Sequence, residues 1–283
     1  MEKNMIREIS SEKIVETVAE LFREACVCPP KEVIDAFAAA KETEVSQQGR
    51  EIFCQLIENA AIANETKVPY CQDTGMAVVL MDIGQDVHIT GDLTDAVNAG
   101  VRKAYTEGYF RKSVLSALGR VNTGDNTPAV LHTRIVPGDK IEITALPKGF
   151  GSENMSKIKM FPPSAGIDGI KDFIVETAAM ASANPCPPVI IGVGIGGTFE
   201  YAAMLSKRQL ARKLGEPSSD PVLAEMEEDI KNRINALGMG PMALGGRNYC
   251  LAVHIAEYPT HIAGLPVAVN YCCHALRHAS ATI

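Results

Sequence analysis

The chain has 283 residues, of which 46% are hydrophobic and 22% charged, a balance typical of globular proteins and sufficient for one large domain or two small ones. Its formal net charge of −7 argues against nucleic acid and anionic membrane surfaces as partners. An anionic ligand would have to be bound by arginine, lysine, backbone N–H groups or a metal gathered locally.

The first sixty residues carry apolar side chains at helical spacing. This spacing predicts helices over residues 11–24, from Pro29-Pro30 to about Phe37, and from Gln48 to Ala60. The N-terminus is charged without an apolar core, and no apolar run approaches membrane-spanning length. We therefore expect a cytoplasmic protein without a secretory signal, in which the eight cysteines stay reduced.

The pattern then changes to short apolar runs between Gly- and Pro-rich turns. Strands are predicted over 77–83, 87–90, 129–136, 140–146, 188–192, 252–257 and 266–269, and helices over 91–105, 167–183, 198–214 and 220–236. The turn Pro137-Gly138-Asp139 predicts a hairpin of the third and fourth strands. We expect a mixed α/β (α+β) fold: an N-terminal helical layer packed on a mixed sheet, in a single large domain over residues 1–283 with site-forming loops.

Five loops are too polar and too rich in glycine or proline to belong to a core. They lie beside apolar runs, where functional sites are usually built. The loops are Val68–Gly75, Val121–Pro128, Lys148–Asn154, Pro185–Pro188 and Tyr258–His261.

The cysteines divide by their surroundings. Cys54 lies on the apolar face of a predicted helix and Cys250 in a predicted strand, so both are interpreted as packing residues. Cys26 and Cys28 precede a Pro-Pro turn and indicate surface or packing roles. Three widely separated cysteines, in contrast, lie in polar loops beside apolar strands: Cys71, Cys186 and Cys273.

Three loop cysteines would suit a catalytic iron–sulfur cluster. Electron-transfer clusters commonly take four cysteine thiolates. A four-iron cluster held by three cysteines leaves one iron with an open position, and that iron is a Lewis acid for a carboxylate or hydroxyl oxygen.

A glycine-rich run, Gly192-Val193-Gly194-Ile195-Gly196-Gly197, offers a competing hypothesis. It has the G-x-G-x-x-G form of a dinucleotide site and would indicate an NAD-dependent oxidoreductase. Such a site needs a second strand ending in an acidic residue about twenty residues later. Here residues 207–214 predict helix and 216–220 a Pro/Ser loop, so we favour a helix N-terminus whose amides face the cluster or an anion.

Six motifs in series resemble the class I (iron–sulfur) fumarate hydratases, and equally the related L-tartrate dehydratase alpha subunits. The resemblance covers nearly the whole chain, in order. The motifs are Pro69–Gly75, Asn122–Asn126, Lys148–Asn154, Cys186-Pro187-Pro188, Gly196-Gly197-Thr198 and Cys273-x₃-Arg277.

This resemblance implies a [4Fe-4S] cluster with one open iron on Cys71, Cys186 and Cys273; Cys272 is the rival third ligand, but the spacing to Arg277 favours Cys273. It also implies roles for other residues. Asp73 is the candidate general base, with a residue of a separate beta subunit as the alternative and Asp73 then only orienting the substrate; Asp73 and His261 are the candidate catalytic residues. The substrate would be bound by Gln72, Asp73, Arg111, His261 and the backbone of Gly151.

The implied function is that of the alpha subunit of a two-subunit hydro-lyase acting on a small dicarboxylic acid. The first candidate is fumarate hydratase of the tricarboxylic acid cycle, which adds water reversibly to fumarate to give L-malate; L-tartrate dehydratase is the alternative. Fused members continue into a smaller second domain, while this chain stops ten residues after Cys273. We therefore expect a separate beta subunit that completes the site, in an α₂β₂ heterotetramer.

A non-catalytic iron–sulfur scaffold is a third class of function. A purely structural cluster has no need of polar groups such as Asp73, Arg111 and His261 around it. We therefore favour the enzyme.

Overall fold

Helices and strands are mixed along the chain in the computed structural model, which describes residues 6–283, and they confirm the mixed α/β class. The chain groups into two compact units. Unit 1 comprises the residues up to Pro30, Ile62–Gly149 and Arg277–Ile283; unit 2 comprises Lys31–Ala61 and Phe150–Leu276. Each unit has its own sheet. The extent of the domain over residues 1–283 stays a prediction.

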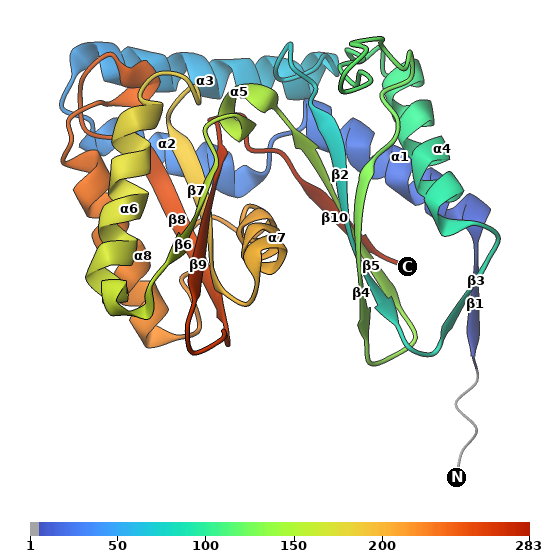
Figure 1. Ribbon diagram of the computed structural model, residues 1–283. Coiled ribbons are helices and arrows are strands. Elements are labelled where there is room, and N and C mark those ends of the chain that lie inside the picture. Colours follow the sequence, from blue (N-terminus) through green and yellow to red (C-terminus); the bar gives the residue numbers. More distant parts are fainter. Residues whose placement is uncertain (1–5) are drawn as a thin grey trace. The chain divides into compact units, whose positions relative to one another are not determined.

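Unit 1 is built on a four-stranded sheet of order β10-β5-β2-β4, beside a two-stranded parallel pair of β1 and β3 (Figure 1). Its elements are β1 (Arg7–Ser10), α1 (Ser11–Val27), β2 (Met76–Gly84), β3 (Val87–Thr90), α4 (Leu93–Glu107), β4 (Val130–Val136), β5 (Ile141–Lys148) and β10 (Ala279–Thr282).

The predicted hairpin of residues 129–136 and 140–146 is wrong, because β2 lies between these two strands. β2 pairs parallel with β4 and antiparallel with β5. The end of β2 enters the turn that joins them: the Gly84 amide donates to the Lys140 carbonyl at 2.8 Å. A Cβ at Gly84 would lie 2.3 Å from the Gly138 carbonyl oxygen, so this insertion requires glycine.

Two amphipathic helices, α1 and α4, cover one face of this sheet. Their N-caps follow the usual chemistry: Ser10 accepts from the Lys13 amide, and Asp92 from the Asp95 amide at 2.9 Å. The buried faces of both helices pack against alternate residues of β2 and β5. The core of unit 1 includes Phe22, Tyr105, Val79, Met81 and Ile143.

Unit 2 is built on a four-stranded sheet of order β6-β9-β7-β8, in which β7 pairs parallel with β8 and antiparallel with β9. The helix α3 (Gln47–Thr66) belongs to this unit up to Ala61. The other elements are α2 (Lys31–Thr43), α5 (Phe150–Glu153), β6 (Lys157–Phe161), η1 (Pro163–Ala165), α6 (Gly166–Ala181), β7 (Val189–Gly196), α7 (Phe199–Gln209), α8 (Pro221–Asn235), η2 (Pro241–Ala243), β8 (Cys250–Tyr258) and β9 (Leu265–Cys272).

Helices cover both faces of the unit 2 sheet. Alternate β7 residues, from Val189 to Ile195, pack with α6 and α8, which lie side by side in Figure 1. The β7 residues between these point to the other face of the sheet. There Gly192 and Gly194 lie against α7, and Ile190 packs with α2 and α3. The three predicted N-terminal helices are thus all present, with α1 on the sheet of unit 1 and α2 and α3 on that of unit 2.

The G-x-G-x-x-G run lies inside β7 and serves packing. A Cβ at Gly192 would lie 2.1 Å from the Ser206 carbonyl oxygen, and one at Gly194 equally close to that of Ala202. Both oxygens belong to α7. These glycines therefore let the helix approach the strand closely, which explains them without a dinucleotide.

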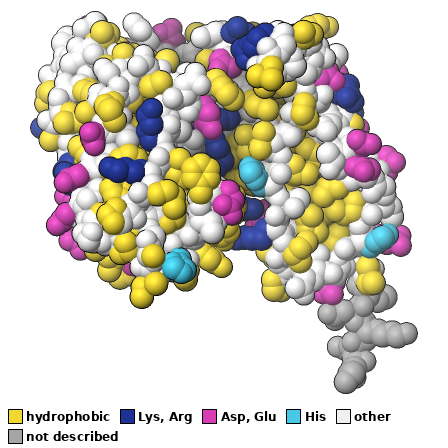
Figure 2. Space-filling view, viewed as in Figure 1, with side chains coloured by type: hydrophobic (Ala, Val, Ile, Leu, Met, Phe, Trp, Pro, Cys, Tyr) yellow, Lys and Arg dark blue, Asp and Glu magenta, His cyan; other side chains and the backbone are white. Residues whose placement is uncertain are grey.

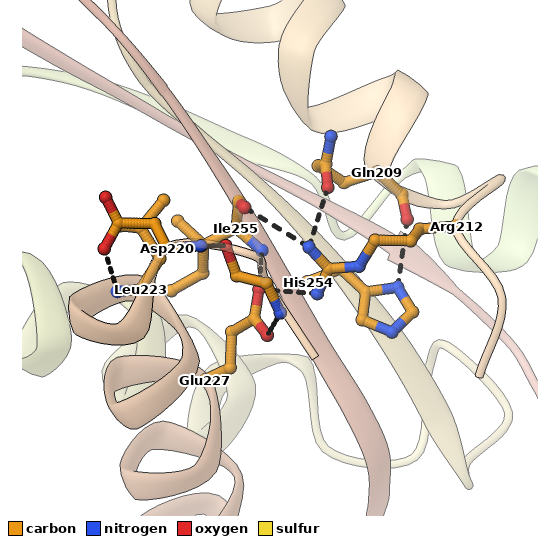
Figure 3. Close-up of polar contacts among 8 residues, drawn as sticks. Gln209, Arg212, Asp220, Leu223, Glu227, His254 and Ile255 are labelled. Atoms are coloured by element: carbon orange, nitrogen blue, oxygen red, sulfur yellow. Dashed lines mark hydrogen bonds and ion pairs between the residues drawn. The ribbon is translucent and has the colours of Figure 1, made fainter. Parts of the chain in front are cut away.

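Side chains of α8 satisfy the backbone of β8, the edge strand of this sheet (Figure 3). Glu227 accepts from the Ile255 amide at 2.7 Å and from Arg212 Nη2 at 2.5 Å. Two turns later, Asn235 exchanges hydrogen bonds of 2.8 and 2.9 Å with the Cys250 amide and carbonyl. These contacts cover an edge that would otherwise be open to pairing with another chain.

Glu44 is a carboxylate with 1% exposure that joins the α2–α3 turn to the segment before β8. It accepts backbone N–H groups of Val45, Ser46, Arg247 and Asn248 at 2.8–3.0 Å. Burial alone would raise the pKa of Glu44, but these backbone hydrogen bonds outweigh burial and lower it.

We expect Glu44→Gln to lower the free energy of unfolding by about 3 kcal/mol at pH 7, because an amide NH₂ would then face backbone N–H groups. The folded pKa lies below the usual 4.5, so the carboxylate stabilises the fold above that pH and loses this effect as pH falls through the folded pKa. Urea denaturation should therefore show a difference between variant and wild type that shrinks in acid. The exposed Glu42→Gln is the control, and an equal loss there would contradict the assignment.

Among the described residues, helices long and apolar enough to span a bilayer are absent. On the face shown in Figure 2, acidic and basic side chains of the described residues are interspersed rather than gathered by sign. This face therefore lacks the continuous basic surface that nucleic-acid binding requires.

Candidate active site

In unit 1, the segment Tyr70–Gly75 connects α3 to β2 and presents three polar side chains. Its start is held by the Tyr70 amide, which donates to the Cys26 carbonyl at 2.9 Å. Its end turns at Gly75 (φ +78°), where a Cβ would lie 2.7 Å from the Lys148 nitrogen. Between these anchors Cys71 and Asp73 are half-buried and Gln72 is exposed. The segment is thus fixed while its functional groups stay accessible.

Asp73 is held at its carboxylate and at its backbone. One carboxylate oxygen accepts from the Gly75 amide at 2.9 Å, and its carbonyl accepts from Arg277 Nη2 at 2.6 Å. The other carboxylate oxygen lies against Gly149, where a Cβ would be 3.2 Å away. The Asp73 side chain therefore has a defined orientation.

Arg277 holds the backbone of the Asp73 segment, which its place in the motif Cys273-x₃-Arg277 did not indicate. It is 2% exposed and fixes the Asp73 backbone. The available signal was an arginine directly after the apolar Ala275-Leu276, because a charged residue among apolar neighbours is retained when it has a partner.

Arg111 lies beside the Asp73 segment. Its side chain is exposed, and its carbonyl accepts from the buried Thr74 hydroxyl at 2.9 Å. The buried Tyr105 hydroxyl also holds this segment, by donating to the Thr74 carbonyl at 2.6 Å. Burial raises the pKa of Tyr105 well above its ordinary value, so the phenol keeps its proton and acts as a donor. The structure thus brings Gln72, Asp73 and Arg111 together in unit 1.

In unit 2, Cys186 and Cys273 lie at one end of the sheet. Cys186 precedes β7 and Cys273 follows β9, at the level where Ile190 pairs with Cys272. The Cys186 carbonyl accepts from the His274 backbone amide at 3.2 Å and contacts His274 Nδ1 at 3.0 Å. Since a carbonyl only accepts, this contact favours the tautomer with the proton on Nδ1.

Burial distinguishes Cys272 from Cys273 as candidates for the third cluster ligand. Cys272 is 7% exposed and packs in the core formed with α2 and α3. Cys273 is half-buried at the end of the strand. Successive residues of a strand point to opposite faces, so only one of the two can lie in that core. The accessible thiol is that of Cys273.

Gly151 lies near the Cys186 segment of unit 2. It is exposed, and a Cβ there would be 3.7 Å from the Asn184 carbonyl oxygen. The short helix α5 that contains it is held through Glu153, which accepts from Lys207 Nζ at 2.5 Å and Asn270 Nδ2 at 3.0 Å. Gly151, Cys186 and Cys273 therefore form the unit 2 part of the candidate site.

His261 lies at the opposite end of the same sheet. It follows Tyr258, which pairs with Gly196, the last residue of β7. Six residues of strand separate this level from Ile190, a distance of about 20 Å. The Thr260 hydroxyl donates to the Gly197 carbonyl at 2.9 Å and holds the loop there. The structure therefore does not bring His261 together with Cys186 and Cys273 of the same chain.

The other cysteines are poor ligands or have other surroundings. Burial raises the pKa of Cys26 and that of Cys250 to about 12, which disfavours the thiolate that binds metal. Cys250 is a packing residue, as predicted. The prediction that Cys54 packs in the core is wrong, because Phe53 and Leu56 form the buried face of α3 and leave Cys54 exposed.

The donor chemistry of Cys71, Cys186 and Cys273 fits an iron–sulfur cluster. All three thiols are exposed or half-buried, and each lies at the end of a strand or before one. Within residues 6–283, the structure gathers no three His, Cys, Asp or Glu side chains around one point as a metal ion would require. Unit 1 supplies one of the predicted ligands and unit 2 supplies two.

Comparison with known proteins decides the family. The model of the family described as Fumarate hydratase (Fumerase) matches residues 15–282. The chain belongs to this family. It is therefore a hydro-lyase enzyme.

Similar proteins cover nearly the whole chain. A Methanocaldococcus jannaschii protein named "Putative L(+)-tartrate dehydratase subunit alpha" is 42% identical over 94% of this chain and 96% of its own length. The L(+)-tartrate dehydratase subunit alpha of Escherichia coli K12 is 31% identical over 94% of this chain and 89% of its own length. This member of the fumarate hydratase family thus aligns over most of its length with proteins named as alpha subunits.

Proposed function

We propose that this member of the fumarate hydratase family is the alpha subunit of a cytoplasmic iron–sulfur hydro-lyase that converts fumarate and water reversibly to L-malate in the tricarboxylic acid cycle. One observation carries the proposal. A hydrogen-bonded segment presents the Cys71 thiol, the Gln72 amide and the Asp73 carboxylate beside Arg111. The proposed metal ligand, the candidate base and the proposed carboxylate-binding group thus lie on two segments that are hydrogen-bonded to one another.

The proposed cofactor is a [4Fe-4S] cluster bound by Cys71, Cys186 and Cys273. The exposure of the thiols supports this ligand set. Cys186 is exposed and Cys71 and Cys273 are half-buried, and each lies in a loop directly before or after a strand.

When bound through three thiolates, the cluster would supply an open iron as a Lewis acid that stabilises charge on substrate oxygens. The other groups belong to the chain. Arg111 would bind one substrate carboxylate in the bidentate manner of a planar guanidinium, and Gly151 would donate its backbone N–H to the same group. Gln72 would orient the substrate through its amide.

Asp73 is the proposed general base. It would take the proton from the carbon adjacent to a substrate carboxylate when malate is dehydrated, and return it when fumarate is hydrated. Its fixed orientation supports this role, because the Gly75 amide and the neighbouring Gly149 hold the carboxylate in one direction.

His261 is proposed to contact the substrate of a second copy of the chain. Within unit 2 it lies about 20 Å along the sheet from the pair Cys186 and Cys273, too far to share a small dicarboxylic acid with them. His261 is exposed on the β8–β9 loop, next to Ile262, which is 90% exposed. A neighbouring copy therefore explains its proposed catalytic role.

A separate beta subunit is proposed to complete the site, in an α₂β₂ heterotetramer. The support is that the similar proteins are named subunit alpha. Two alpha chains per assembly would also provide the second copy that His261 requires, since closed symmetric pairs are the commonest arrangement of like subunits.

L-tartrate dehydratase is the second candidate function. The names of the similar proteins favour it. Fumarate hydratase and tartrate dehydratase act on four-carbon dicarboxylic acids, so Arg111 and Asp73 would serve either reaction. An NAD-dependent reaction is disfavoured, because Gly192 and Gly194 are explained by the close approach of α7.

We expect the chain, co-expressed anaerobically with its beta subunit, to show a kcat/KM for fumarate at least about tenfold above that for L-tartrate. Loss of fumarate absorbance and formation of oxaloacetate measure the two reactions. The reverse ranking would establish the tartrate dehydratase, and turnover of neither substrate would contradict the proposed function. The chain without its beta subunit serves as the control.

A further inference from the structure

The loop between α4 and β4 contains a buried asparagine for which the proposed chemistry has no role. Asn126 is 0% exposed and lies in the left-handed region (φ +65°), which asparagine tolerates better than most residues. It ends the Asn122–Asn126 motif of the sequence. A polar side chain with complete burial must be hydrogen-bonded, and its partners indicate what it does.

The Asn126 side chain joins two separate segments of unit 1. Its carbonyl oxygen accepts from the Ser113 amide at 2.7 Å and the Val114 amide at 3.2 Å. Its NH₂ group donates to the Gly75 carbonyl at 3.1 Å. Because backbone amides only donate and carbonyls only accept, these partners fix which end of the side-chain amide is oxygen.

The two segments are those that present the proposed substrate-binding groups. Gly75 lies two residues after Asp73, and Ser113 lies two residues after Arg111. A second bond joins the same segments, from the Thr74 hydroxyl to the Arg111 carbonyl at 2.9 Å. Arg111 is thus held at its own carbonyl by Thr74 and two residues later by Asn126.

Asn126 is itself anchored from both sides. The preceding residue, Asp125, accepts from Arg102 Nε on α4 at 2.7 Å and from the Thr127 hydroxyl at 2.7 Å. Burial would raise the pKa of Asp125, but the hydrogen bonds from Thr127 and Arg102 outweigh it and lower the pKa to about 2. Three residues after Asn126, the Ala129 amide donates to Asn98 Oδ1 at 2.9 Å. These contacts fix the position of Asn126, and the hydrogen bonds of its side chain in turn fix the two segments that it joins.

We propose that Asn126 is a positioning residue that sets the Arg111 segment against the Asp73 segment, so that the guanidinium meets the substrate carboxylate while Asp73 meets the carbon-bound proton. This inference rests on the proposed function and extends it to a residue outside the chemistry. A displacement of about 1 Å between such groups is enough to impair a reaction a hundredfold.

The test compares Asn126→Ala and Asn126→Asp with Asn98→Ala in the co-expressed enzyme. Asn126→Asp keeps an oxygen for the Ser113 and Val114 amides but turns a second oxygen toward the Gly75 carbonyl, so it breaks the connection selectively. Asn98→Ala removes one bond from the same loop without touching either segment. We expect KM for the turned-over substrate to rise about tenfold or more in both Asn126 variants and less than about twofold in Asn98→Ala.

Two further measurements separate positioning from a merely structural role. Hydrogen exchange of the Ser113 and Val114 amides should become at least about tenfold faster in Asn126→Ala, with exchange in the α1 and α4 helices unchanged. In an Arg111→Ala background, Asn126→Ala should raise KM by less than about twofold, because residues that act through one another are non-additive.

An unchanged KM in both Asn126 variants, or the same tenfold rise in the Arg111→Ala background, would overturn the inference. Failure of the proposed function would give a different result: the wild-type enzyme itself would turn over neither fumarate nor L-tartrate.

Discussion

Changing Cys186 to serine is expected to remove the iron–sulfur cluster and to lower turnover at least about a thousandfold. Cys71→Ser and Cys273→Ser should do the same. The thiolate is the metal ligand, and a serine hydroxyl stays protonated and hard where iron in a cluster takes sulfur. The measurements are iron and sulfide content per chain after anaerobic purification, with wild type close to four of each, and the visible absorption of the cluster.

Matched controls come from cysteines outside the proposed ligand set. Cys54→Ser changes an exposed thiol on α3, and Cys272→Ser changes the neighbour of a proposed ligand. Both should retain the full iron content, although Cys272→Ser will cost some stability because its side chain lies in a core. If Cys272→Ser loses the cluster and Cys273→Ser keeps it, the third ligand is wrongly assigned.

The fold class could be predicted because apolar periodicity marks elements well. The helices predicted over 167–183 and 220–236 agree with α6 and α8, and the strand predicted over 77–83 agrees with β2. Pairing was harder. The turn at Pro137-Gly138-Asp139 exists, but its two strands are separated by β2, because turn chemistry fixes the direction of the chain and not which strand fills the space beside it.

Short edge elements were missed for a related reason. β1 and β10 are four residues long and have one large apolar side chain, Ile9, between them, and each takes its conformation from the strand with which it pairs. β6 (Lys157–Phe161) has three apolar residues, but it is short and borders Pro162, so its strand signal is weak. Pairing with β9 along its whole length makes it a strand.

The sequence singled out the residues proposed to carry the chemistry more readily than those that hold them. Cys71 and Asp73 lie in a polar loop that composition marks, and the family resemblance implies their roles, which stay predictions. Arg277 and Asn126 act through long-range hydrogen bonds to the Asp73 and Gly75 carbonyls. A long-range hydrogen bond produces no periodic pattern in the sequence, and an arginine or an asparagine is equally common on a protein surface.

For His261, the sequence predicts a role in the site but not the geometry by which the residue reaches it. A residue can be assigned to a site by its motif, but the sequence does not say which copy of the chain provides it. The unit 2 sheet sets His261 at one end and Cys186 and Cys273 at the other. If His261 serves catalysis, two defective alpha chains should therefore repair one another.

We expect the single variants His261→Ala and Cys186→Ser to retain less than about 1% of wild-type turnover, and mixed pairs of the two to regain about half. In a mixed pair, one site combines both defects. The other combines the cysteines of the His261→Ala chain with the histidine of the Cys186→Ser chain and is intact. Two different affinity tags on the alpha chains, used in succession, isolate the mixed assemblies for assay.

The matched control pairs Cys186→Ser with Asp73→Asn. Both residues are proposed to serve the same site from the same chain, so neither site of this mixed pair is intact and no activity should return. Recovery in the control would mean that subunit mixing alone restores turnover. Absence of recovery in the His261 and Cys186 pair, with both tags present and iron bound to the His261→Ala chain, would show that His261 does not act across the pair. Since about 20 Å of strand excludes action within the chain, that result would also remove His261 from the site.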